Sequence, residues 1–417
     1  MSVAISSGAA GFLARYDALR DVLPGDPAIR AAAAEAFRTA GLPGAERGRR
    51  PVEAWKYTSL RPLAEAAFGG GATASSPVMA ELDPAMTEGA GGAPRAITFV
   101  NGLHHSGAVT RFADTPILPC ADSARLPLVA LNTMLAADGA VIEIPAGADG
   151  ETILLRHIAT AADACHPRHT IRLGAGARLT VLELAEGSAA SLHNPVTIIT
   201  VGAGAQLTHV RIQNEDAAAF HLTTILVDVG QDATYDGFTL NLGGRLTRTE
   251  YHATLSGAGA IAHMNGAQLL AGTQHADFTS VVRHAEPRGT SRQTVKNVLA
   301  GRSRGVFQGR IEVARGAQKT DGYQMNQALL LSPDAEIDTK PELEIFADDV
   351  KCSHGATVGE LDADQLFYLR TRGIAEQEAR AILIRAFLTE ALEAVTNEPI
   401  RAILEASVQG WWERQVA

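Results

Sequence analysis

One cysteine and one histidine near the carboxyl end have the spacing of a metal-ligand pair. Cys352 and His354 lie in the segment Asp348–Gly355, shortly after the alternating strand pattern of Glu342–Ile345. In an extended chain, residues two apart project to the same side, ~6.6 Å apart at ~3.3 Å per residue, so a thiolate and an imidazole can converge on one metal ion. Composition weakens this pattern, because with 13 histidines and three cysteines in 417 residues the spacing arises by chance in about one chain in ten. Spacing alone therefore favours a structural role.

A second group of potential ligands comprises His157, Cys165, His166 and His169. Cys165 and His166 are adjacent, and adjacent residues of an extended chain point to opposite faces, so these two would diverge. We expect Cys165 to be buried as a small apolar side chain. The remaining histidines are expected to be outward-facing or hydrogen-bonded at strand ends: His104, His105, His221, His252, His263, His275 and His284.

Several familiar catalytic patterns are missing from the chain. It has no Gly-x-x-x-x-Gly-Lys-Ser/Thr loop, so the usual cradle for ATP phosphates is absent. It also has no His-Glu-x-x-His zinc motif and no Cys-x-x-Cys pair. We therefore expect a non-catalytic protein.

Charge and composition exclude further classes. Of the 417 residues, 46% are hydrophobic and 20% are charged, and no apolar run approaches the ~18 residues of a membrane-spanning helix. The net charge of −10 argues against partners held by phosphate neutralisation, so we expect neither nucleic acid nor a membrane surface as a partner. Three scattered cysteines cannot form a disulfide framework, and the amino terminus lacks a secretory signal pattern. A cytoplasmic location is the expectation.

An internal repeat predicts the architecture that positions these residues. Gly174–Thr180 recurs as Gly202–Thr208, weakly as Gly230–Asp236 and again from Gly257, at a nearly constant interval of about 28 residues. Short Val-, Ile- and Thr-rich runs lie between these glycine-rich turns. A constant interval with strand and turn chemistry is typical of a β-solenoid, whose units bury their apolar faces by stacking. A β-sandwich is the alternative, but it does not require a constant interval.

Both ends of the chain have helical patterns, which gives three predicted regions. We expect an N-terminal helical domain and linker over residues 1–92, a β core over 93–360 and a C-terminal helical domain over 361–417. The linker prediction rests on the glycine- and serine-rich residues 69–77. Near the carboxyl end, Asp362 is a candidate N-cap and Gly373 a candidate helix stop.

The helix expected from about residue 375 to 395 has two apolar stripes side by side. One stripe is enough to dock a helix on its own domain, so the excess indicates either deep burial or contact with a partner protein. The pattern alone leaves these two possibilities open.

The residues around Cys352 closely resemble a known family. Ile345–Gly359, continued by Leu366–Ile374 and Glu378–Phe387, resembles the SufB/SufD iron–sulfur assembly family. Three upstream segments also resemble this family, and its SufD branch in particular: Glu53–Leu60, Phe99–Gly102 and Leu131–Asn132. The resemblance extends from about residue 50 to the carboxyl end.

The resemblance implies a fold, partners and a cofactor. The fold is a right-handed parallel β-helix with helical domains at both ends, and the partners are a SufB-like subunit and a SufC-like ATPase. A transient, nascent iron–sulfur cluster is built at the junction with the SufB-like subunit, where this chain contributes His354 and, as a further candidate, Cys352. The C-terminal helices dock the ATPase, with Ile384, Phe387 and Leu388 as candidate contacts. The isolated chain is expected to bind no cluster and to be capable of forming a homodimer.

A simple count of ligands supports a shared site. An iron–sulfur cluster takes about four protein ligands, and Cys352 and His354 supply two at most, so a second chain must provide the rest. Two alternatives stay open. The chain can be a purely structural subunit without metal contact, or a β-helix polysaccharide lyase or hydrolase, which would need an exposed carboxylate cluster.

Overall fold

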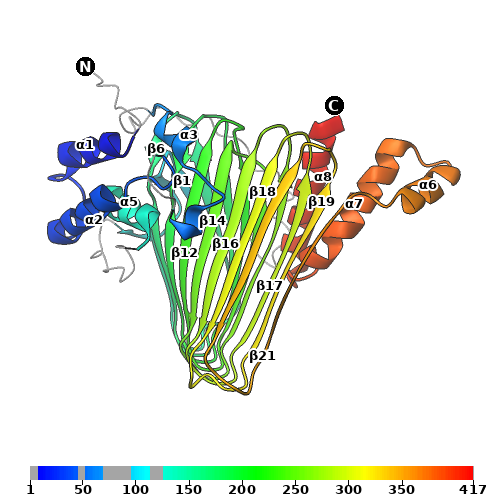
Figure 1. The fold of residues 1–417 in the computed structure, drawn as a ribbon. Helices are drawn as coiled ribbons and strands as arrows, with labels where there is room; N and C mark the ends of the chain where they lie inside the picture. The colour runs from blue at the N-terminus through cyan, green and yellow to red at the C-terminus, as the bar shows by residue number, and fades with distance from the viewer. Residues whose placement is uncertain (1–7, 46–51, 69–94, 113–124, 417) are drawn as a thin grey trace.

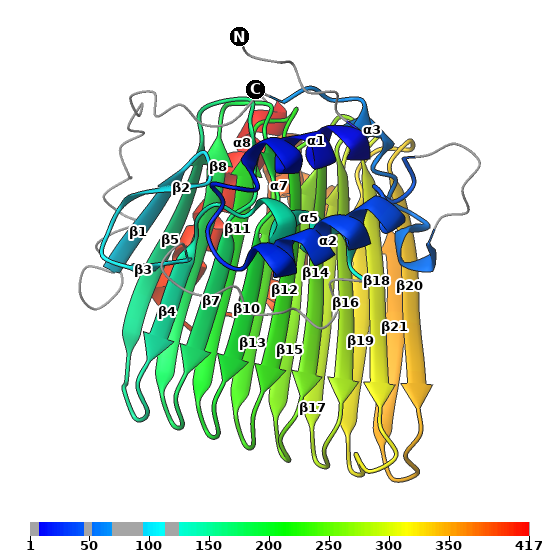
Figure 2. The ribbon, with the colours of Figure 1, turned by 90° about the vertical axis from the view of Figure 1, so that its left-hand side faces the viewer.

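The computed structural model describes residues 8–45, 52–68, 95–112 and 125–416. Two long sheets face each other, and the chain alternates between them, so that each turn adds one strand to each sheet (Figures 1 and 2). Among the strands of the described residues nearly all pairings are parallel, and only β1 with β2 and β3 with β4 are antiparallel. The result is a parallel β-solenoid of about eight turns, which confirms the architecture predicted from the repeat.

The strands have the following bounds. In the ten-stranded sheet they are β1 (Arg95–Val100), β2 (Leu103–Ser106), β5 (Glu151–Ala159), β8 (Arg178–Gly187), β11 (Gln206–Glu215), β13 (Thr234–Asn241), β15 (Ile261–Leu270), β17 (Thr290–Leu299), β19 (Asp321–Leu330) and β21 (Lys351–Gly359). In the second sheet they are β3 (Thr110–Arg111), β4 (Ala140–Ile144), β6 (Ala164–Cys165), β7 (Arg168–Leu173), β9 (Leu192–His193), β10 (Val196–Val201), β12 (Phe220–Val229), β14 (Leu246–Leu255), β16 (His275–His284), β18 (Arg304–Val313) and β20 (Glu336–Ile345).

The sequence repeat sets the register between turns. Arg178 on β8 pairs with Gln206 on β11, and Gln206 pairs in turn with Thr234 on β13, each one repeat further along the chain. The glycine-rich turns stack as a column, because the amide of Gly176 donates to the carbonyl of Ala203 at 2.8 Å. Gly176 has a φ of +68°, in the left-handed region that favours glycine, as the repeat predicted.

The interior between the two sheets has an apolar half and a polar half. Near the glycine-rich turns, inward positions are aliphatic or aromatic and form one continuous cluster. At the opposite end of the same strands, the buried inward side chains are polar or charged: His157, His169, Glu183, His193, His209, Arg211, Gln213, Glu215 and His221. Stacked turns therefore enclose ionisable groups as well as hydrocarbon.

Helices cover the outer face of each sheet (Figure 1). On the second sheet lie α1 (Ala9–Leu19), α2 (Pro27–Ala40), the 3₁₀ turn η1 (Glu53–Trp55), α3 (Arg61–Ala64) and α5 (Pro127–Leu135). Trp55 is buried there, with the guanidinium of Arg248 3.9 Å from the centre of its ring. The helix α5 lies inside the region expected to be β core. The predicted linker at residues 69–77 lies outside the described residues.

Three helices follow the last strand: α6 (Ala363–Thr371), α7 (Glu376–Leu392) and α8 (Glu398–Val416). Asp362 caps α6 as predicted, because its carboxylate accepts from the amides of Asp364 and Gln365. Gly373 ends this segment with a φ of +86°. Helices α7 and α8 pack on the ten-stranded sheet, whereas α6 projects away from it (Figure 1). Within the described residues, no helix is both long and apolar enough to cross a bilayer. The division at residues 92 and 360 into separate domains stays a prediction.

Candidate functional site

Cys352 and His354 lie on β21, the last strand of the ten-stranded sheet. This strand pairs with β19, and no described strand covers its other edge. Cys352 is in register with Gly322, and His354 with Gln324. The last turn of the solenoid is therefore an open end, and the two candidate ligands lie on it.

The two side chains share one face, as their spacing predicted. Residues in register on parallel strands point to the same side of the sheet, so His354 lies on the face of the fully buried Gln324. His354 is nevertheless exposed and Cys352 is half-buried. The lack of a following turn exposes inward-type positions that every earlier turn buries.

The surroundings of Cys352 favour a protonated thiol. The side chain packs against an apolar cluster that includes Ile311, Val313 and Ala317. Burial raises the pKa of the Cys352 thiol, and a hydrogen bond with the backbone of Gly322 lowers it in part. A metal ion bound here must displace the thiol proton, so this residue is a weaker ligand than an exposed thiolate.

The imidazole of His354 has no hydrogen bond or ion pair to any other described residue. The open turn also has exposed apolar side chains: Ile345 at the end of β20, Phe346 directly after it and Val358 on β21, with Phe346 67% exposed. Lys340 on β20 is paired, since its ammonium lies 2.7 Å from a carboxylate oxygen of Glu53. The exposed imidazole of His354 and several exposed apolar side chains therefore lie on the same open turn of the solenoid.

The three candidate contacts for the ATPase have a different placement. Ile384 and Leu388 on α7 are buried at 2% and 0% exposure against the ten-stranded sheet. Phe387 is partly buried, and the ammonium of Lys296 lies 4.7 Å from its ring centre. The stripe that contains Ile384 and Leu388 is deeply buried, whereas in the other stripe Ile382 and Leu383 are half-buried and Ala386 is exposed, so a partner contact stays a prediction for that stripe. A partner cannot reach Ile384 or Leu388 while α7 stays in place.

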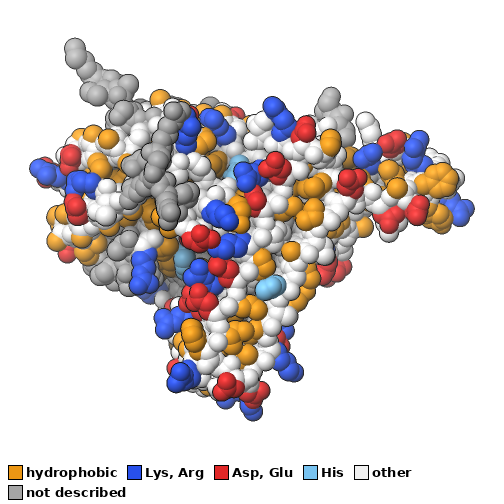
Figure 3. Space-filling view, viewed as in Figure 1, with side chains coloured by type: hydrophobic (Ala, Val, Ile, Leu, Met, Phe, Trp, Pro, Cys, Tyr) orange, Lys and Arg blue, Asp and Glu red, His pale blue; other side chains and the backbone are white. Residues whose placement is uncertain are grey.

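The exposed aromatic side chains of the C-terminal helices belong to α6 instead. Phe367 is 69% exposed and Tyr368 is 57% exposed. Hydrophobic side chains are visible on the projecting arm that contains α6, among charged side chains of both signs (Figure 3). The sequence analysis missed these residues as candidate contacts, although two adjacent aromatic residues in a short helix were a usable signal.

Two of the histidine predictions are confirmed in their second form. His221 near the start of β12 and His284 at the end of β16 are buried and hydrogen-bonded, to Glu215 and Ser291. Cys165 is buried, as expected, and burial raises its pKa to about 12. His169 points into the solenoid, and its ring centre lies 5.0 Å from that of His157.

One serine motif can be set aside on structural grounds. Gly301–Gly305 matches the pattern Gly-x-Ser-x-Gly, which marks a nucleophile when it joins a strand to a helix. Here it joins two strands, and Ser303 is fully buried. It is a turn of the solenoid and not a catalytic elbow.

Comparison with known proteins identifies what this arrangement is similar to. A sequence model described as the SufBD core domain of the SUF system for FeS cluster assembly matches residues 156–387. The chain is 42% identical over 171 residues to the iron–sulfur cluster assembly protein SufD of Escherichia coli, and 38% identical over 180 residues to the chloroplastic protein ABCI7 of Arabidopsis thaliana. These matches cover 41% and 43% of this chain, and 40% and 38% of the two relatives. The aligned regions thus span about two fifths of the relatives' length.

Proposed function

Because the chain belongs to the SufBD family of the SUF iron–sulfur cluster assembly system, we propose that it is a scaffold subunit on which a nascent cluster is built and from which it is passed on. In this proposal the cluster is cargo and not a resident cofactor. The chain pairs with a SufB-like subunit and with a SufC-like ATPase. The observation that carries the proposal is the exposed imidazole of His354 at the open end of the solenoid.

An incomplete ligand set suits assembly and transfer. Two donors at most, His354 and Cys352, face the open end, whereas an iron–sulfur cluster takes about four protein ligands. A cluster held partly by each of two chains is more accessible than one enclosed by four ligands of a single chain. We assign His354 as the principal ligand, because its ring is free, and Cys352 as an auxiliary one.

The open end also supports the pairing with a second solenoid. Edge strands present unpaired backbone groups, and β20 and β21 are the edges of their sheets. The exposed side chains of Phe346 and Val358 add apolar surface at this end. A SufB-like solenoid that continues the stack would cover both and would bring its own ligands to His354.

We place the ATPase contact on α6 rather than on α7. The side chains of Phe367 and Tyr368 are exposed on the arm that projects from the solenoid (Figure 1). The chain has no phosphate-binding loop, so nucleotide hydrolysis takes place on the SufC-like partner. Movement of this arm against the sheet is the means by which hydrolysis would act on the cluster site.

The test is anaerobic co-expression with SufB-like and SufC-like partners, followed by purification and measurement of iron and sulfide. His354→Ala should leave an intact complex with little iron or sulfide, whereas Cys352→Ser should reduce both to a smaller extent. His105→Ala is the matched control, since His105 is also an exposed histidine on a strand.

Two outcomes would count against the ligand assignment. An intact His354→Ala complex with the iron and sulfide content of the wild type would favour a purely structural subunit. If the His354→Ala complex does not assemble, thermal unfolding of the variant alone separates misfolding from a direct role of His354 in pairing. The same purification with Phe367→Ala and Tyr368→Ala tests the ATPase contact.

A further inference from the structure

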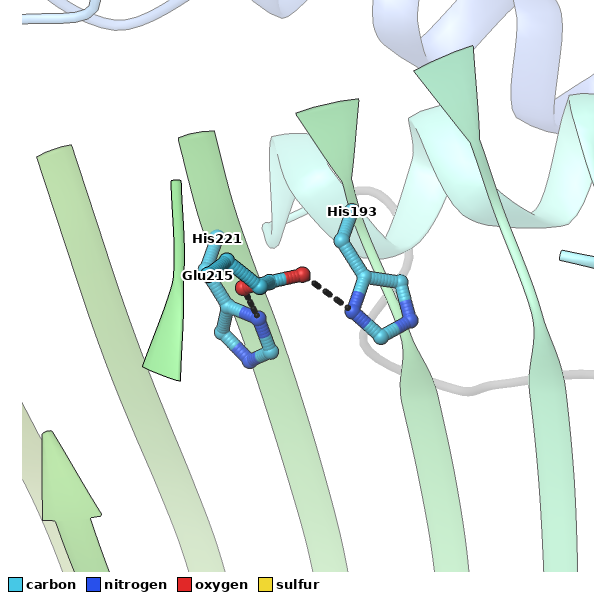
Figure 4. Close-up of side chains that lie close together, drawn as sticks. All are labelled: His193, Glu215 and His221. Carbon is cyan, nitrogen blue, oxygen red and sulfur yellow. Dashed lines mark hydrogen bonds and ion pairs between the residues drawn. The ribbon is translucent and has the colours of Figure 1, made fainter. Parts of the chain in front are cut away.

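Three potential metal ligands meet inside the solenoid, away from the open end. His193 on β9 is in register with His221 on β12, one turn later, and Glu215 is the last residue of β11. The carboxylate of Glu215 lies between the two rings (Figure 4). One oxygen is 3.2 Å from Nδ1 of His193, and the other is 2.7 Å from Nδ1 of His221. One donor atom from each residue lies within 4.8 Å of the other two.

The charge in this cluster is not balanced by an arginine or lysine. Glu183, one turn earlier, is also buried between histidines, but Arg211 donates to both of its oxygens at 3.0 and 3.2 Å. Within the described residues, Glu215 has no such partner; it accepts from His221 and from the neutral amide of Gln213, and lies 3.2 Å from the ring of His193. A buried carboxylate is costly when no cation compensates its charge.

The ring of His193 provides a second, independent observation. Its side chain is 6% exposed, and neither ring nitrogen makes a hydrogen bond of acceptable geometry within the described residues. Buried polar atoms in native proteins nearly always have a partner. A buried ring that faces a carboxylate at 3.2 Å without a well-formed hydrogen bond is therefore suited to bind a cation.

We propose that His193, Glu215 and His221 bind one divalent first-row transition-metal ion, such as Zn²⁺ or Fe²⁺, as a structural site inside the solenoid. Two imidazoles and one carboxylate suit these ions, whereas Mg²⁺ and Ca²⁺ prefer oxygen ligands alone. Three protein ligands leave a fourth position for water. The ion would link β9, β11 and β12 and would neutralise the buried carboxylate.

The surrounding contacts orient the ligands. Gln213 donates to Glu215 and accepts from the amide of Gly243 at 3.1 Å, so the carboxylate is held from the side. The other nitrogen of His221, Nε2, lies 3.3 Å from Arg211. If Nδ1 of His221 binds the ion, the ring proton moves to Nε2. Nε2 then can no longer accept from Arg211, so the 3.3 Å contact is lost. Arg211 keeps its two hydrogen bonds to Glu183.

Access to the site is restricted. Glu215 borders a cavity of about 480 Å³ whose walls also include Arg245, Trp411 and Arg414. The two guanidinium groups disfavour the entry of a cation. We therefore expect the ion to be taken up as the chain folds and to exchange slowly afterwards.

The experiment uses the full chain without a histidine tag, unfolded in chelator and refolded with Zn²⁺ or with Co²⁺. Wild type should retain one metal per chain after desalting, measured by elemental analysis. Glu215→Gln and His193→Gln should retain little. His284→Gln is the matched control, because His284 is an equally buried histidine outside the cluster and should not affect metal content.

The Co²⁺ spectrum of the wild-type chain keeps the test valid if the variants do not fold. A nitrogen and oxygen site gives visible bands without the near-ultraviolet thiolate charge transfer that Cys352 would produce. Wild type that binds no stoichiometric metal overturns the proposal, as do triad variants that bind as much as wild type. The double variant Cys352→Ser, His354→Ala should keep the metal, so the result does not depend on the proposed assembly function.

Discussion

The middle turns of the solenoid and its last turn carry similar side chains in opposite surroundings. In the middle turns, Glu183 and Arg211 are stacked on successive turns and are enclosed by turns on both sides. On the last turn, Cys352 and His354 occupy the same kind of inward position, but no described strand follows. Stacking therefore decides whether an ionisable group stabilises the fold or is available to another molecule. The predictions below test this difference.

The largest expected effect is on a buried pair of the middle turns. Glu183→Gln should lower the free energy of unfolding by roughly 3–5 kcal/mol, because it leaves the guanidinium of Arg211 buried without its carboxylate. Urea denaturation followed by circular dichroism measures this loss. Glu143→Gln removes an exposed pair with Arg172 and should cost less than about 1 kcal/mol. Equal losses of unfolding free energy in the two variants would show that burial between stacked turns does not determine how much an ion pair contributes to stability.

The helices extend the same comparison. Leu388→Ala on α7 should cost roughly 2–5 kcal/mol, because it removes a fully buried side chain between α7 and the sheet. Phe367→Ala on α6 should leave the unfolding midpoint unchanged, since that ring is 69% exposed. The same denaturation experiment compares them. A strong destabilisation by Phe367→Ala would mean that α6 packs against the body of the chain.

The buried histidines predict a loss of stability in acid. Burial lowers the pKa of His169 from 6.5 to about 4, so the unfolded chain takes up this proton at a higher pH than the folded chain does. The contribution is complete above pH 6.5 and is lost as the pH falls through about 4; it amounts to roughly 3 kcal/mol. Thermal unfolding between pH 7 and pH 4 measures the change, and His169→Gln should flatten the profile. A profile that is equally steep in this variant would assign the effect to other groups.

The solenoid could be predicted from the sequence because its signal is local and repeated. The glycine-rich turn at Gly174 recurs at a constant interval, and the same interval separates Glu183 from Arg211. It also separates His193 from His221. The turn repeat predicted the stacking. The clusters of buried ionisable side chains could have been found by searching the sequence for charged residues and histidines that are separated by the same interval.

Other features could not be predicted, because they depend on distant segments. The nine residues of α5, Pro127–Leu135, are all buried, and so short an apolar run does not distinguish a helix from a strand. The burial of Ile384 and Leu388 depends on a sheet surface whose strands, β15 and β17 among them, lie far from α7 in the sequence. The exposure of His354 depends on where stacking stops, which the spacing of Cys352 and His354 does not indicate.

The smallest expected effect on stability is at the open end. His354→Ala should not change the unfolding midpoint of the isolated chain, because the ring is exposed and makes no hydrogen bond within the described residues. His284→Ala, at a buried inward position of the middle turns, should lower that midpoint clearly, since it removes the bond to Ser291 and leaves a cavity. Thermal unfolding of both variants measures the contrast. If His354→Ala were as destabilising as His284→Ala, the open turn would be a packed part of the fold, and His354 would not be free to bind a cluster.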